Sequence, residues 1–170
     1  HASQYRKGSK APFVAHLLSV CAIILEDGGT EDEAIAGLLH DAVEDQGGLK
    51  ALESIKNTFG EPIAQIVLEC SETHLTPKPP WKKRKVKSIS KMKHVSDSAI
   101  RVILADKIHN SQSLIREHQK YGTIIWRNFK AGREGTIWYF KEVLAVLIDR
   151  TTSNLISELK LAVDGIEKLK

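Results

Sequence analysis

Four ionisable side chains follow one another inside an apolar stretch of the sequence, and they are the residues best suited to chemistry. The stretch runs from 34 to 45, and its charged members are His40, Asp41, Glu44 and Asp45. A helical period of about 3.6 residues is fitted by the apolar residues at positions 35, 38, 39, 42 and 43. On such a helix His40 stacks over Glu44 and Asp41 stacks over Asp45, so two polar ridges run side by side.

Carboxylates among apolar residues need a compensating charge, because burying an unpaired one costs several kcal/mol; a metal ion supplies the largest such charge. Asp106 raises the same question, since it lies on a predicted central helix with apolar residues on both sides. His16 lies on the apolar face of another predicted helix. Alternatively, His16 is a satisfied core histidine, Asp41 and Asp45 form a solvated face, and Asp106 pairs with Arg101 or a lysine. This alternative requires each of these unrelated explanations to hold at once, so a shared metal site is favoured.

The order His16, then His40-Asp41, then Asp106 resembles the HD-domain metal phosphohydrolases, whose ligands follow the order H, HD, D on an all-helical bundle. Residues 40–45 read HDAVED and resemble the H-D-x-x-E-D motif of one branch of that family. The branch comprises the RelA/SpoT-type (p)ppGpp hydrolase domains and the related small alarmone hydrolases. Most other HD proteins lack the Glu-Asp pair, so the resemblance is to this branch in particular and not only to the HD family as a whole.

Two further segments are similar to this branch. Residues 104–110 read LADKIHN, which resembles the family segment L-A-D-K/R-L/I-H-N. Arg6 and Lys7 precede residues 12–16, PFVAH, as a basic pair precedes P-Y-I-x-H in the family. The resemblance thus covers residues 4 to 110, with Phe13 standing where tyrosine is common.

The resemblance implies one divalent metal held by four ligands, namely His16, His40, Asp41 and Asp106. Two imidazoles with two carboxylates suit Mn²⁺, while Fe²⁺, Co²⁺ and Zn²⁺ are alternatives. The resemblance also implies that Glu44 is the general base or acid and that Asp45 aligns the water or the proton path. The implied substrate contacts are Arg6, Lys7 and Asn110.

The positive charge of the chain is concentrated in one segment. Eight of the 25 basic residues lie between Glu72 and Asp97, where there is no acidic residue; the rest of the chain has 17 basic against 21 acidic residues. This pattern is typical of a solvated face or of a rim that attracts a polyphosphate. Trp81 offers a single stacking platform rather than a track for single-stranded nucleic acid, so nucleic acid is not an expected partner.

Length and composition predict one domain over residues 1–170, with 42% hydrophobic residues to form its core. The resemblance implies that this domain is an HD hydrolase domain. Because the chain opens on His1 and its single methionine is Met92, part of the natural N-terminus is expected to be missing. No apolar run reaches the roughly 18 residues of a membrane span, so no membrane association is expected. Cys21 and Cys70 lack the paired spacing of a metal or redox motif, which favours a reducing cytoplasm.

Alternation with period two is not sustained anywhere, so the predicted fold is all-α. The resemblance implies that the helices form an HD-domain helical bundle. A capping box at Thr30 and Glu33 predicts one helix from 31 to about 45. The basic segment after Trp81 is predicted to be helical, with a small role in packing. The other expected helices cover about 13–26, 49–59, 62–70, 97–120, 134–149 and 152–168. The last of these is a candidate surface for a homodimer.

The leading hypothesis is a metal-dependent nucleotide pyrophosphohydrolase that removes the 3′-diphosphate of (p)ppGpp. One alternative is a phosphohydrolase that acts on another nucleotide or phosphate ester. A second is a non-catalytic HD module that binds a nucleotide, although such a sensor has no need of Glu44 and Asp45. A third is a helical nucleic-acid-binding protein that uses residues 78–93.

Overall fold

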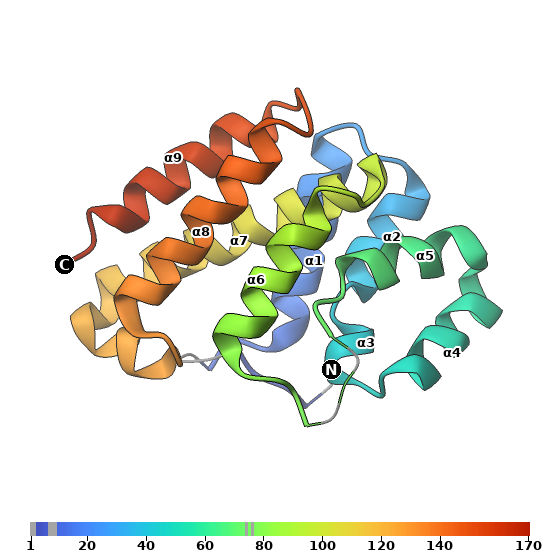
Figure 1. The fold of residues 1–170 in the computed structure, drawn as a ribbon, viewed down its shortest axis with the longest axis horizontal. Helices are drawn as coiled ribbons and strands as arrows, with labels where there is room; N and C mark the ends of the chain where they lie inside the picture. The colour runs from blue at the N-terminus through green and yellow to red at the C-terminus, as the bar shows by residue number, and fades with distance from the viewer. Residues whose placement is uncertain (1–2, 7–9, 74, 76) are drawn as a thin grey trace.

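The computed structural model describes residues 3–6, 10–73, 75 and 77–170, which form a bundle of helices (Figure 1). The helices are α1 (Phe13–Glu26), α2 (Glu31–Leu39), α3 (Ala42–Asp45), α4 (Leu49–Phe59), α5 (Glu61–Cys70), α6 (Trp81–Met92), α7 (Asp97–Tyr121), the 3-10 helix η1 (Gly122–Asn128), α8 (Gly132–Ile148) and α9 (Leu155–Glu167). The described residues contain no β-strand, only an isolated bridge between Tyr5 and Pro12. The predicted all-α class is confirmed. No helix among these residues has the length and apolar character to cross a membrane.

Helix α7 lies at the centre of the bundle. Helices α8 and α9 pack on one side of it and α2 and α5 on the other, while α1 passes behind it in Figure 1. Its buried apolar residues are Ala99, Ile100, Val102, Ile103, Leu104, Ala105, Ile108 and Leu114. The prediction of a central helix with a buried carboxylate is confirmed, since Asp106 is only 7% exposed.

The predicted start of α2 is also confirmed. Thr30 Oγ1 accepts a hydrogen bond from the backbone N–H of Glu33, and the Glu33 carboxylate accepts one from the backbone N–H of Thr30. Gly28, with φ of 75°, turns the chain between α1 and this cap. The same carboxylate accepts a hydrogen bond of 2.7 Å from Arg101 on α7. The cap therefore also ties α2 to the central helix.

Replacing Glu33 by glutamine is expected to lower the free energy of unfolding at neutral pH by about 1–3 kcal/mol, the usual contribution of a hydrogen bond to a charged group. Burial raises the pKa of Glu33, but the hydrogen bonds from Thr30, Ser98 and Arg101 outweigh it, and the pKa lies below 4.5. The contribution is therefore complete above pH 4.5 and is lost as the pH falls through the folded-state pKa.

Denaturant unfolding of the wild type and Glu33→Gln at neutral and acidic pH measures this difference. Glu31→Gln is the matched control, because Glu31 is exposed in the same helical turn; it should change stability by about 0.5 kcal/mol or less. A Glu33→Gln difference that stayed the same at both pH values would contradict the assignment.

The prediction of one continuous helix from 31 to 45 is wrong. Helix α2 ends at Leu39 and α3 begins at Ala42, with His40 and Asp41 between them. The backbone of Asp41 has φ of −93° and ψ of −4°, so it departs from helical geometry at this residue. Asp45 still donates its N–H to the Asp41 carbonyl at 3.0 Å. Hydrophobic periodicity missed the break because the chain keeps roughly helical spacing across it.

The expectation that the basic segment has little packing role is also wrong. In α6, Trp81 packs edge-on against Trp138 and Tyr139 of α8, with ring centroids 6.1 and 6.3 Å apart. Further along α6 the buried residues are Ser88, Ile89 and Met92. Few residues of α6 are apolar and they lie among lysines, so the sequence shows no clear apolar face for this helix.

Helix α9 buries one face against α7 and α8. Leu161 on its other face is 72% exposed. Homodimer formation through this helix stays a prediction.

Candidate metal centre

Three buried side chains from separate helices converge on one point. His16 comes from α1, His40 follows the end of α2, and Asp106 comes from the middle of α7, with exposures of 1%, 5% and 7%. One ring nitrogen or carboxylate oxygen from each lies within 4.8 Å of the others. The Nε2 atoms of His16 and His40 lie 3.2 and 3.6 Å from Asp106 Oδ1. We call these three residues the donor cluster; they form a possible divalent metal site.

Asp41 lies at the edge of the donor cluster. Its Oδ2 atom is 3.2 Å from His40 Nε2 and 3.7 Å from His16 Nε2, and its side chain is 27% exposed. The structure thus brings all four predicted ligands together, with Asp41 on the more open side. The break between α2 and α3 places the adjacent His40 and Asp41 side chains around the same point.

The hydrogen bonding of His40 fits a metal ligand. His40 Nδ1 lies 2.7 Å from the Gly37 carbonyl oxygen, which can only accept, so Nδ1 carries a proton. His40 Nε2 is buried and has no well-aligned hydrogen bond among the described residues; the atoms that face it are carboxylate oxygens of Asp41 and Asp106, at 3.2 and 3.6 Å. Buried polar atoms normally have a partner. The lone pair of a neutral imidazole at this position would bind a metal ion well.

The electrostatics of the donor cluster also favour a cation. Burial alone would lower the pKa of His40, but the carboxylates of Asp41 and Asp106 outweigh it and raise this pKa well above 6.5. Burial alone would raise the pKa of Asp106, but Lys107 and the two histidines hold it well below 3.8. The donor cluster therefore keeps its carboxylate ionised and attracts positive charge, whether a proton or a metal ion.

A second layer of side chains surrounds the donor cluster. Lys107 and Asn110 both donate to the Asp106 carboxylate, each at 2.5 Å. His109 Nδ1 lies 2.7 Å from His16 Nδ1, and burial together with His16 lowers the pKa of His109 to about 4. The sequence pattern alone did not assign a role to Lys107 or His109. Both residues belong to the LADKIHN segment, and this was the sequence feature that could have indicated a place near the site. The contact between His109 and His16 is visible only in the structure, where α1 packs against α7.

Glu44 and Asp45, on α3, are in contact with the basic segment. Lys78 Nζ lies 3.0 Å from Glu44 Oε1 and 2.8 Å from Asp45 Oδ1. Arg84 Nη1 lies 3.6 Å from Glu44 Oε1 and is itself held by the buried carboxylate of Glu72. The charge run left a solvated face and a basic rim as alternatives. The contacts of Lys78 with both carboxylates and of Arg84 with Glu44 depend on how residues 77–92 fold back onto α3.

Two of the three predicted substrate contacts also meet. Arg6 Nη2 donates to Asn110 Oδ1 at 2.7 Å, and Asn110 in turn donates to Asp106. The guanidinium carbon of Arg6 lies 5.9 Å from the centre of the Phe13 ring. The third predicted contact, Lys7, lies outside the described residues.

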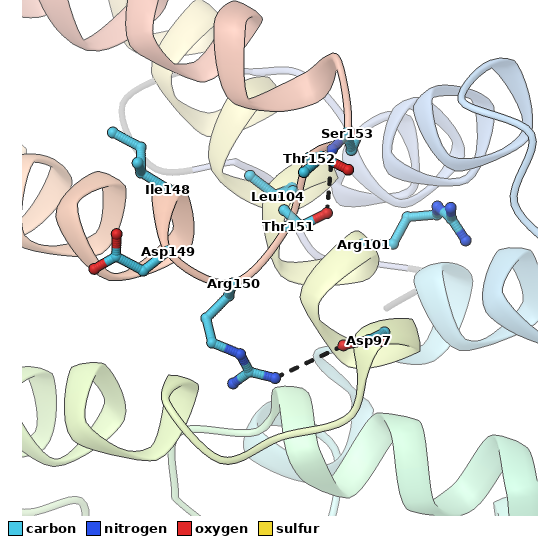
Figure 2. Close-up of a pocket in the computed structure, with 9 residues that line it drawn as sticks. All are labelled: Asp97, Arg101, Leu104, Ile148, Asp149, Arg150, Thr151, Thr152 and Ser153. Carbon is cyan, nitrogen blue, oxygen red and sulfur yellow. Dashed lines mark hydrogen bonds and ion pairs between the residues drawn. The ribbon is translucent and has the colours of Figure 1, made fainter.

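A cavity of about 460 Å³ has a lining that includes no residue of the donor cluster, and Figure 2 shows the side chains that line it. Its lining comprises Asp97, Arg101, Leu104 and the residues from Ile148 to Ser153. Leu104 and Asp106 leave α7 in directions about 160° apart, so the cavity and the donor cluster lie on different faces of that helix. Arg150 donates to the carbonyls of Met92 and Val95, while Arg101 pairs with two acidic residues at the α1–α2 connection. These guanidinium groups tie segments together, and the cavity is not the candidate site.

Comparison with known protein families assigns this chain to a family. A protein-family model described as the HD domain matches residues 1–137, which include the donor cluster and the Glu44-Asp45 pair. The chain belongs to the HD-domain family. The predicted family and the predicted HD helical bundle are therefore confirmed.

The chain is also similar to MESH1 proteins, which are named as guanosine-3′,5′-bis(diphosphate) 3′-pyrophosphohydrolases. The Xenopus tropicalis protein is 37% identical over 119 residues, which are 68% of this chain and 64% of that relative. The mouse protein is 29% identical over 160 residues, covering 88% of this chain and 87% of that relative. The chain thus spans just under two thirds of the frog protein it matches.

Two solved structures share the fold of this chain. A Listeria monocytogenes protein superposes with a TM-score of 0.79 and 28% identity, covering 90% of this chain and 99% of its own. A metazoan ortholog of SpoT that hydrolyses ppGpp superposes with a TM-score of 0.74 and 26% identity, covering 100% of this chain and 90% of its own.

Proposed function

We propose that the chain is a single HD hydrolase domain, a metal-dependent nucleotide pyrophosphohydrolase that removes the 3′-diphosphate of (p)ppGpp. The observation that carries this proposal is the convergence of His16, His40 and Asp106 in an HD-domain chain that keeps Glu44 and Asp45. Relatives named for hydrolysis of this nucleotide support the choice of substrate.

The donor cluster and Asp41 would hold one divalent metal ion, with Mn²⁺ as our first choice because the donors are imidazoles and carboxylates. Fe²⁺, Co²⁺ and Zn²⁺ are the alternatives that the same donors accept. A divalent ion there would lower the pKa of a bound water molecule and offset the negative charge of a phosphate group. Lys107 and Asn110 would hold the Asp106 carboxylate in place through their hydrogen bonds.

The protein side chains account for the proton transfers. Glu44 takes a proton from the attacking water, and Asp45 orients that water. The water oxygen bonds to the phosphorus attached to O3′, the P–O3′ bond breaks, and the proton passes from Glu44 to O3′. Hydrolysis of ppGpp then yields GDP and pyrophosphate.

The basic side chains around the site suit a substrate with several negative charges. Lys78 and Arg84 lie on the Glu44 side, and Arg6 lies on the Asn110 side. Arg6, Lys7 and Asn110 are proposed to contact the nucleotide, with the Arg6 guanidinium able to fork onto phosphate or stack on a base. A cytoplasmic location agrees with the free thiols of Cys21 and Cys70.

Incubation of the Mn²⁺-loaded protein with ppGpp is expected to release pyrophosphate and GDP in equal amounts. Metal-free protein is the control and should be inactive, and parallel loading with Fe²⁺, Co²⁺ and Zn²⁺ ranks the metals. Turnover of other nucleotides but not of ppGpp would contradict the substrate and keep the reaction class. Nucleotide binding without turnover under every metal would show a binding module instead.

A further inference from the structure

His109 belongs to the LADKIHN segment, but the proposed reaction gives it no role. It lies on α7, half-buried, with its Nδ1 atom 2.7 Å from the Nδ1 atom of His16. The two ring centroids are 4.8 Å apart. Two ring nitrogens at this distance form a hydrogen bond with one proton between them, so one imidazole donates and the other accepts.

The orientation of His16 shows which nitrogen would bind a metal. Its Nε2 atom faces the carboxylates of Asp106 and Asp41, at 3.2 and 3.7 Å. A histidine ligand binds through the lone pair of a neutral ring, so its other nitrogen carries the proton and needs an acceptor. For His16 this second nitrogen is Nδ1, and its neighbour is His109.

His40 shows the same requirement met by a different acceptor. There the backbone carbonyl of Gly37, at 2.7 Å, fixes the proton on Nδ1 and leaves Nε2 for the centre of the donor cluster. His16 lies in the regular helix α1, and its hydrogen-bond partner at Nδ1 is the side chain of His109 on a neighbouring helix. The two histidines of the donor cluster would thus bind through the same kind of nitrogen.

We propose that His109 is a positioning residue: it accepts a hydrogen bond from Nδ1–H of His16 and so leaves His16 Nε2 free to bind the metal ion. This inference rests on the metal site of the proposed function. Loss of such an outer partner typically weakens metal binding by about 10- to 100-fold. The effect acts on metal affinity and is measurable without any substrate.

Two substitutions separate the hydrogen bond from the space that the ring fills. In His109→Asn, the side-chain oxygen occupies about the position of Nδ1 and can accept the same hydrogen bond. In His109→Leu, no acceptor is left. Titration calorimetry with Mn²⁺ and Zn²⁺ is expected to give a Kd raised about 10- to 100-fold for His109→Leu and about threefold or less for His109→Asn.

Ser111→Ala is the matched control, because it removes a buried hydroxyl that bonds to the Ile108 carbonyl on the same helix. Its metal Kd should equal that of the wild type.

Nitrogen-15 NMR of the Zn²⁺-loaded wild type should show a proton on His16 Nδ1. Equal metal Kd values for His109→Leu and the wild type would overturn the role of His109, as would equally weak binding by the Asn and Leu variants. A wild type that binds no metal would overturn the metal site and this inference together.

Discussion

Replacing His40 by alanine is expected to abolish metal retention and to reduce hydrolysis by at least about a thousandfold. His40 Nε2 is a buried nitrogen that faces the carboxylates of Asp41 and Asp106, and alanine removes both contacts. Metal ions contribute several kcal/mol to hydrolysis, and about 1.4 kcal/mol corresponds to a tenfold change in rate. Metal analysis of the purified variant and pyrophosphate release from ppGpp measure the two effects.

The control for this variant is His94→Ala, because His94 is exposed between α6 and α7 and its loss should change neither metal content nor rate. Asp106→Asn removes another member of the donor cluster with little change of shape, and its metal content should fall in the same way. Thermal unfolding of each variant separates loss of metal from loss of fold. A folded His40→Ala protein with full metal content would contradict the proposed site.

Replacing Glu44 by glutamine is expected to lower kcat by about 10²- to 10⁴-fold, the range attributed to general acid–base catalysis. Metal content should be unchanged, because Glu44 lies outside the donor cluster and contacts Lys78 and Arg84 instead. KM should change little, since glutamine keeps the size and one oxygen of the side chain. Steady-state kinetics combined with metal analysis therefore distinguish this effect from that of His40→Ala.

The matched control is Glu53→Gln on α4, which neutralises an exposed carboxylate away from the site and should leave kcat unchanged. Asp45→Asn tests the division of roles between the neighbouring carboxylates, and a smaller loss of kcat is expected. If Glu44→Gln raised KM and kept kcat, the residue would be a binding contact rather than the proton acceptor.

The fold class and the buried carboxylate were predictable because the spacing of apolar residues along the sequence records both of them. Apolar residues with helical spacing predicted the all-α bundle, and the Thr30–Glu33 cap correctly placed the start of α2. Asp106 in an apolar helix predicted a buried carboxylate, which the structure confirms. The break at His40 and Asp41 left no such trace, because a turn with nearly helical geometry disturbs the apolar pattern very little.

The sequence by itself determined which residues could do chemistry: the charged residues of segment 40–45, a histidine in α1 and an aspartate in α7 are unusual inside apolar helices. Only the tertiary structure decided their neighbours. Lys78 against Glu44, Arg6 against Asn110 and His109 against His16 are pairs 34, 104 and 93 residues apart. Helical periodicity records which face of a helix is buried, but it carries no information on which distant side chain meets that face. That choice follows from how the helices pack around α7.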